Sequence, residues 1–145
     1  ITATLGASGK DQFRMVHEGH FNPPPTQEYA QYVRTFKAKY PNQDISYPRI
    51  INTVQMLAKA IEQAGSADPL AVAHALENME HTSIGGERLM MRAEDHQLFQ
   101  PIQISVHTDD GIEFDGDNSG FGLLTEVSIP LENTLLPTSC EMRRP

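Results

Sequence analysis

The hydrophobic period of the chain changes at Gly85 and Gly86, and this change limits the folds that the sequence can adopt. Before this glycine pair, apolar residues recur every three or four positions, as on one face of a helix. After it they alternate with polar residues, as in strands. Residues 13–17 form a short predicted strand ahead of the helices. The order of a strand, three helices and several strands favours an α/β or α+β fold, and 145 residues suffice for one domain.

Three amphipathic helices are predicted between the proline run at residues 22–25 and the glycine pair. Each has a recognisable start or stop: Thr26 and Pro41 bound the first, Tyr47, Pro48 and Gly65 the second, and Asp68 with Pro69 opens the third. Their apolar stripes consist of Tyr29, Val33, Phe36 and Tyr40, then of Ile50, Val54, Leu57, Ala58 and Ile61, and then of Leu70, Ala73, Leu76 and Met79.

Strands are predicted where apolar and polar residues alternate, with Asp- and Gly-rich turns between them. Their apolar positions are Leu89 and Met91, then Ile102, Ile104 and Val106, then Ile112 and Phe114, and then Phe121, Leu123, Val127 and Ile129. Several sheet edges in this stretch need partners. We therefore expect the chain by itself to leave apolar sheet edges unpaired, and to be unstable or self-associating.

The composition argues against nucleic-acid binding and against a membrane-spanning segment. The formal net charge is −8 and no run of Lys and Arg occurs, so the chain repels nucleic-acid phosphates. No stretch of eighteen apolar residues is present to span a membrane. The chain begins at Ile1 without Met, and we expect a signal or a longer N-terminal portion to have been removed. Cys140 is single, so it is a free thiol or half of a disulfide with a partner elsewhere.

Two clusters offer metal-ligand chemistry. His17 and His20 stand three residues apart before the proline run, which does not fit a zincin motif, and surface histidines are favoured over a zinc site. Residues 115–126 satisfy the calcium-loop pattern, with ligands at Asp115, Asp117, Ser119 and Glu126 and a turn at Gly120. Predicted strands flank this loop where an EF-hand has helices, so an acidic hairpin loop is favoured over calcium.

Evidence for catalysis in the sequence is weak. Neither a nucleophile elbow nor a phosphate-binding loop is present. A metal-dependent enzyme or a calcium-binding domain, using residues 115–126 or His17 and His20, is the alternative to a binding protein. The polar cluster at residues 94–97 has two interpretations: Asp95 and His96 are a proton-transfer pair or metal ligands, or the cluster is a polar turn that leads into a strand.

Three blocks of the sequence resemble periplasmic solute-binding proteins for branched-chain amino acids. They are I-N-T-V-Q-M-L-A-K-A-I-E-Q-A-G-S-A-D-P at residues 51–69, M-R-A-E-D-H-Q-L-F-Q-P-I at 91–102, and P-T-S-C-E-M-R-R-P at 137–145. The amphipathic helix that leads to Tyr40 and Pro41 also resembles the corresponding helix of this family. Within this family the cluster at residues 94–97 lies in a connection between elements, which favours the polar turn.

The resemblance implies an α/β fragment of a type I fold, which has two Rossmann-like lobes around a ligand cleft. Residues 1–40 would end lobe 2, with a hinge crossing somewhere in 21–46. Residues 41–101 would return to lobe 1, and residues 102–145 would cross the hinge and lead back to lobe 2. The implied partners are a small solute, the missing N-terminal part of the receptor and an ABC permease, without a cofactor. A cytoplasmic ligand-sensing regulator is less favoured, because Cys140 suggests an oxidising periplasm.

The resemblance also implies ligand contacts. Leucine/isoleucine/valine-binding proteins carry an acidic residue before a strand that corresponds to residues 13–16, and here that position is Gln12. Gln12 is neutral and cannot form an ion pair with an α-ammonium group, so a carboxylate or amide solute fits better than a branched-chain amino acid. Gln12, Phe13 and Arg14 are therefore the predicted ligand contacts, and Arg49 is a weaker candidate near the hinge.

Overall fold

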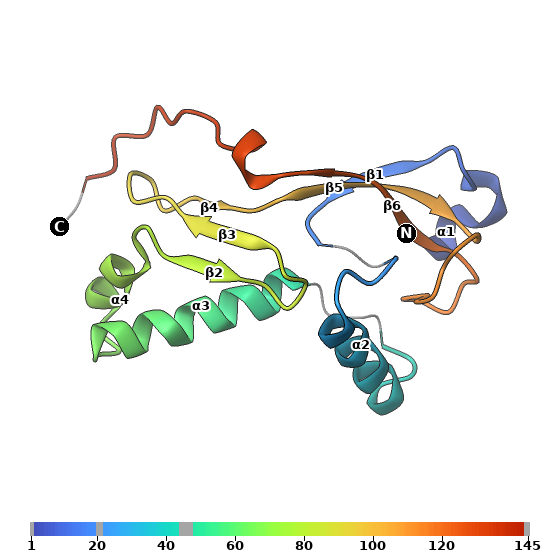
Figure 1. The fold of residues 1–145 in the computed structure, drawn as a ribbon, viewed down its shortest axis with the longest axis horizontal. Helices are drawn as coiled ribbons and strands as arrows, with labels where there is room; N and C mark the ends of the chain where they lie inside the picture. Colours follow the sequence, from blue (N-terminus) through green and yellow to red (C-terminus); the bar gives the residue numbers. More distant parts are fainter. Residues whose placement is uncertain (1, 20–21, 44–47, 144–145) are drawn as a thin grey trace.

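A computed structural model of the chain describes residues 2–19, 22–43 and 48–143. The strands form two antiparallel three-stranded sheets (Figure 1). The long sheet has the order β1 (Arg14–His17), β5 (Ile102–Thr108) and β6 (Gly122–Ile129). The short sheet has the order β2 (Glu80–Thr82), β3 (Arg88–Met91) and β4 (Leu98–Phe99). Gln100 and Pro101 join β4 to β5, so the two sheets follow each other end to end.

The helix starts, and the end of the second helix at Gly65, lie where the sequence predicts. In α2 (Gln27–Lys39) the Thr26 hydroxyl accepts a hydrogen bond from the Tyr29 N–H, at 3.0 Å. The helix α3 (Pro48–Ala64) ends at Gly65, whose φ of +60° suits glycine, and predicted start residue Tyr47 lies outside the described residues. In α4 (Pro69–Leu76) the Asp68 carboxylate accepts hydrogen bonds from two N–H groups of the first turn. Two short turns, α1 (Thr2–Leu5) and the 3-10 helix η1 (Gly6–Gly9), precede β1.

Three predictions about elements were wrong. Met79 is not part of the third helix, because α4 ends at Leu76 and Asn78 turns the chain with a φ of +56°. Strand β2 was missed, since three residues are too few to show a period, whereas β4 is a strand to which the polar turn at residues 94–97 leads, as expected. Residues 112–114 form no strand, because the Asn22 side chain takes the place of a strand partner. Its Oδ1 accepts from the N–H groups of Glu113 and Phe114, both at 2.9 Å.

Two hydrophobic clusters hold the elements together. Met56 and Ala60 of α3 pack against Val72 of α4 and against Met79, beneath the short sheet. The second cluster surrounds α2 and consists of Tyr29 and Val33 with Tyr32, Phe36, Ile84 and Phe114. Because Ile84 lies in the β2–β3 hairpin and Phe114 in the β5–β6 loop, α2 contacts both sheets through this cluster.

The apolar stripe of α3 does not face this core. Ile50, Val54, Leu57 and Ile61 are exposed, and the helix buries Asn52, Met56 and Ala60 instead. The long sheet shows a related inversion along β5. Its polar residues Gln103, Ser105 and His107 are fully buried, whereas Ile102 and Ile104 are only partly covered. The described chain therefore leaves apolar surface open on a helix and on a sheet.

The chain beyond β6 returns to the short sheet (Figure 1). After the 3-10 helix η2 (Leu131–Asn133), the Thr134 hydroxyl donates to the Gln100 carbonyl at 3.3 Å, and Arg92 donates to the Leu136 carbonyl. Cys140 is exposed in this tail as a free thiol. Among the described residues, no helix combines the length and the apolar character that crossing a bilayer requires.

Candidate functional site

The cluster at residues 94–97 is a structural turn, which confirms the polar-turn interpretation. The Asp95 carboxylate binds the Arg92 guanidinium at two atoms, one of them at 2.9 Å, and accepts from the Gln97 N–H at 3.1 Å. The Arg92 hydrogen bond holds the pKa of Asp95 far below its usual range. His96 turns the chain with a φ of +54°, and its Nε2 lies 3.2 Å from a carboxylate oxygen of Glu77. These contacts join β3 to β4.

The predicted ligand contacts lie at the start of β1. Gln12 is exposed and Phe13 is half-buried. The guanidinium of Arg14 binds both carboxylate oxygens of Glu126 on β6, at 3.0 and 2.9 Å, and also donates to the Asp11 carbonyl. A side chain held in this way is less available to a solute than Gln12.

The predicted calcium ligands are held by contacts within the protein. Asp115 accepts hydrogen bonds from the N–H groups of Asp117 and Gly120, and Asp117 accepts from the Thr2 hydroxyl at 2.6 Å. Glu126 is bound to Arg14 on the long sheet. The part of the chain that the structure describes holds no group of three His, Cys, Asp or Glu side chains fit for a metal. The acidic loop is thus explained by its own hydrogen bonds.

His17 is not the surface histidine that the sequence favours. It is buried on the long sheet, and its Nε2 lies 2.8 Å from the Ser105 hydroxyl, which in turn lies 3.3 Å from the Thr125 hydroxyl. Burial lowers the pKa of His17, which favours the neutral imidazole. His20, the second predicted ligand, lies outside the described residues.

Polar contacts link the two sheets where they meet. The Gln103 side-chain amide on β5 donates to a carboxylate oxygen of Glu87, at 2.8 Å, and Glu87 precedes β3. Burial raises the pKa of Glu87. The Thr26 hydroxyl donates to the Ile84 carbonyl in the same hairpin, at 2.8 Å. The sequence analysis did not predict these contacts between the sheets. The one signal for them in the sequence is the polar residue Gln103 within a regular strand.

A further link joins β1 to α3. The Glu18 carboxylate follows β1 and forms a 2.8 Å ion pair with Arg49, the second residue of α3. Arg49, the weaker candidate for a ligand contact, is therefore engaged with Glu18. Because β1 belongs to the long sheet and α3 packs beneath the short sheet, this pair spans the junction between them.

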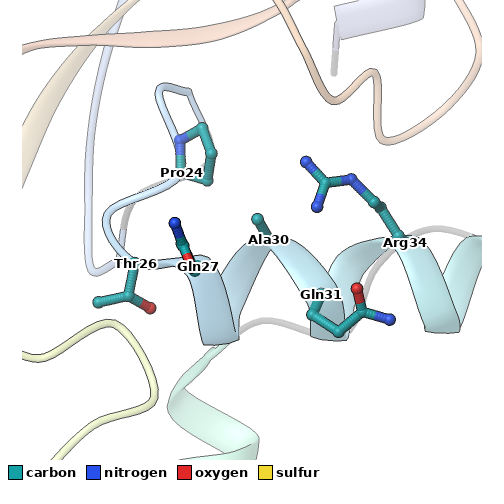
Figure 2. Close-up of a pocket in the computed structure, with 6 residues that line it drawn as sticks. All are labelled: Pro24, Thr26, Gln27, Ala30, Gln31 and Arg34. Atoms are coloured by element: carbon teal, nitrogen blue, oxygen red, sulfur yellow. The ribbon is translucent and has the colours of Figure 1, made fainter.

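A pocket of about 450 Å³ lies along one side of α2 (Figure 2). Its lining consists of Pro24, Thr26, Gln27, Ala30, Gln31 and Arg34. Figure 2 shows Gln27 and Arg34 extending from the side of α2 that faces Pro24, which lies in the loop before the helix. Arg34 also forms a 2.7 Å ion pair with Glu113 and stacks over the Phe114 ring. The lining supplies amide and guanidinium donors, which suit a carboxylate or amide group.

Comparison with known proteins gives one family and several related structures. A family model described as periplasmic binding protein matches residues 2–111. No curated protein matches the chain. The chain is similar to a leucine-, isoleucine-, valine-, threonine- and alanine-binding protein from Brucella ovis in its closed conformation, with a TM-score of 0.80 and 20% identity. This match covers 98% of the chain and 37% of the Brucella protein.

Two structures from Rhodopseudomonas palustris are similar as well. One is an ABC-type branched-chain amino acid transporter protein, with a TM-score of 0.64, 16% identity and coverage of 86% of this chain and 32% of that one. The other is a solute-binding protein of an ABC transporter in complex with 3,4-dihydroxybenzoic acid, with a TM-score of 0.68, 14% identity and coverage of 90% and 34%. The chain spans about a third of the length of the structures that it matches. At these identities the likeness shows the α/β fold.

Proposed function

The chain belongs to the periplasmic binding protein family, and from this premise we propose that it is part of a longer receptor that captures a small solute for an ABC uptake transporter. The observation that carries the proposal is the family match over residues 2–111, which includes both sheets up to the end of β5. The receptor would work in the periplasm and deliver its solute to a membrane permease. Capture of this kind needs no catalytic step.

The two sheets would belong to two lobes that close around the solute. Residues 1–40 would end lobe 2, residues 41–101 would lie in lobe 1, and residues 102–145 would cross back. One hinge crossing would fall in 21–46, and residues 21 and 44–46 of that range lie outside the described residues. A second crossing would pass through Gln100 and Pro101. The contact of Thr134 with the Gln100 carbonyl supports a third crossing after β6. Closure would exclude water from the solute and complete its contacts.

The solute would carry a carboxylate or amide group. Gln12, Phe13 and Arg14 remain the predicted contacts, with the Gln12 amide offering both donors and an acceptor and no negative charge for an ammonium group. The names of the related structures support a carboxylate, because 3,4-dihydroxybenzoic acid and the amino acids share that group. An aromatic or aliphatic acid without a free ammonium group fits Gln12 best.

A melting experiment on the longer receptor tests this function. Amino acids, aromatic carboxylates and short-chain amides are added one at a time, and we expect at least one carboxylate or amide to raise the melting temperature. The variant Gln12→Ala should reduce that increase, while Gln63→Ala, at an exposed glutamine of α3, should not. A receptor that responds to no solute and turns over a substrate would contradict the function. An unchanged response in Gln12→Ala would remove only the predicted contact.

A further inference from the structure

The apolar stripe of α3 is exposed although its spacing is that of a packed helix face. The exposed fractions are 54% for Ile50, 61% for Val54, 45% for Leu57 and 38% for Ile61. These residues follow each other at intervals of four, three and four, so they form one continuous stripe. Isolated apolar side chains are common on protein surfaces, but a stripe along a whole helix indicates a missing contact.

The long sheet has a matching open surface on the other side of the junction. Val16 on β1, Ile104 on β5 and Val127 on β6 are paired in register, so they form a row across all three strands. Val16 is 65% exposed and Val127 49% exposed. The opposite face of β5 carries the buried polar residues Gln103, Ser105 and His107, so the row faces away from that side, and Val106 is the one residue of β5 that is both apolar and buried. An antiparallel sheet can leave one face to water, but that face then carries polar side chains, whereas this row is apolar.

We propose that the α3 stripe is covered by a segment of the same receptor that lies outside these 145 residues, and that the row Val16–Ile104–Val127 is covered in the same way. This inference rests on the proposed function, because it requires a longer receptor. The related Brucella structure matches 98% of this chain with 37% of its own length. Nearly two-thirds of such a receptor would therefore lie outside this chain, which is enough to supply a covering segment for both surfaces.

A second copy of the chain is the competing occupant. The stripe lies on the helix beneath the short sheet and the row lies on the long sheet, so a second copy would cover both only if the stripe of each copy packed against the row of the other. A longer chain that enters both lobes covers both surfaces without a second molecule.

Thiol labelling of cysteine variants tests the proposal. Cys140 is first changed to Ser, and Val54→Cys is compared with Glu62→Cys, an exposed polar position on the same helix outside the stripe. In the longer receptor without solute, we expect the thiol at 54 to react at least about tenfold more slowly than the thiol at 62. In the same receptor unfolded in urea, the two thiols should react at similar rates. Leu57→Cys repeats the test should Val54→Cys disturb folding, which circular dichroism would detect.

Three results would overturn the proposal. Equal rates at positions 54 and 62 in the longer receptor would leave the stripe uncovered. Protection at 54 that disappears on dilution would assign the stripe to a second copy. A gene that encodes this stretch alone would supply no covering segment. Because the labelling needs no solute, protection at 54 in a receptor that responds to no solute would keep this inference and contradict only the proposed function.

Discussion

Glu18 and Arg49 form a 2.8 Å ion pair that joins the end of β1 to the first turn of α3. The two residues belong to the two sides of the molecule that we assign to different lobes. A contact of this kind is formed or broken when the lobes move, so it contributes to the balance between open and closed receptor.

Removing this ion pair should weaken solute binding slightly. In the longer receptor, we expect Arg49→Ala to raise the Kd by at most about fivefold, because a partly exposed pair contributes about 0.2–1 kcal/mol. Titration calorimetry at low and high salt measures the effect, which should shrink as salt screens the charges. Lys10→Ala removes an ion pair between the residue after η1 and Asp109 after β5, both beside the long sheet, and should leave the Kd unchanged. Equal effects of both variants would contradict the assignment of Glu18 and Arg49 to different lobes.

Asn22 should be among the most sensitive positions for stability. Its side chain is fully buried and binds the backbone of Glu113 and Phe114 and the carbonyl of Leu123. Asn22→Ala leaves these backbone groups without partners and should lower the free energy of unfolding by about 2–4 kcal/mol. Urea denaturation measures the loss, with Gln27→Ala on the exposed start of α2 as control. A loss below about 0.5 kcal/mol would show that another group or water replaces the amide.

Glu87 should make stability depend on pH. Burial raises its pKa in the folded chain, so the folded state keeps a proton that the unfolded state releases above the ordinary value of 4.5. Stability from this group is complete below that value and is lost as pH rises through the folded pKa. Glu87→Gln removes the titration and keeps an acceptor for Gln103. Denaturation is measured from pH 4 to pH 8. The free energy of unfolding of the variant should rise relative to that of the natural protein as pH increases, and a constant difference between the two would contradict this.

The caps of α2 and α4 should differ in their effect on stability. Thr26 accepts from the Tyr29 N–H and donates to the Ile84 carbonyl, whereas Asp68 acts only at its own helix. We expect Asp68→Ala to cost about 1 kcal/mol and Thr26→Ala about 2 kcal/mol. Thermal melts give the comparison, and Thr26→Ser should be nearly neutral because it keeps the hydroxyl. Equal losses would mean that the Ile84 contact contributes nothing.

Local signals predicted the helices and most of the strands. The caps at Thr26 and Asp68 and the end at Gly65 depend on neighbouring residues, so the sequence contains the information directly. Strand β2 is too short to show a period, and the role of Asn22 depends on residues far away in the chain. Such contacts leave no periodic pattern in the sequence.

Periodicity also failed to predict which faces are buried. The spacing of the α3 stripe is that of a buried helix face, yet the stripe is exposed. The side of the helix that is buried carries Asn52, Met56 and Ala60. Likewise, Gln103 reads as a solvent-facing strand residue but binds Glu87 at the junction. Both cases reflect tertiary partners, which overrule local pattern.

Small-angle X-ray scattering of the longer receptor, with and without a solute that raises its melting temperature, tests the central claim most directly. If two lobes close around the solute, the radius of gyration falls on binding, and it falls less when Arg49→Ala weakens the closed form. A solute that binds tightly while the radius of gyration stays constant would contradict closure of the two lobes.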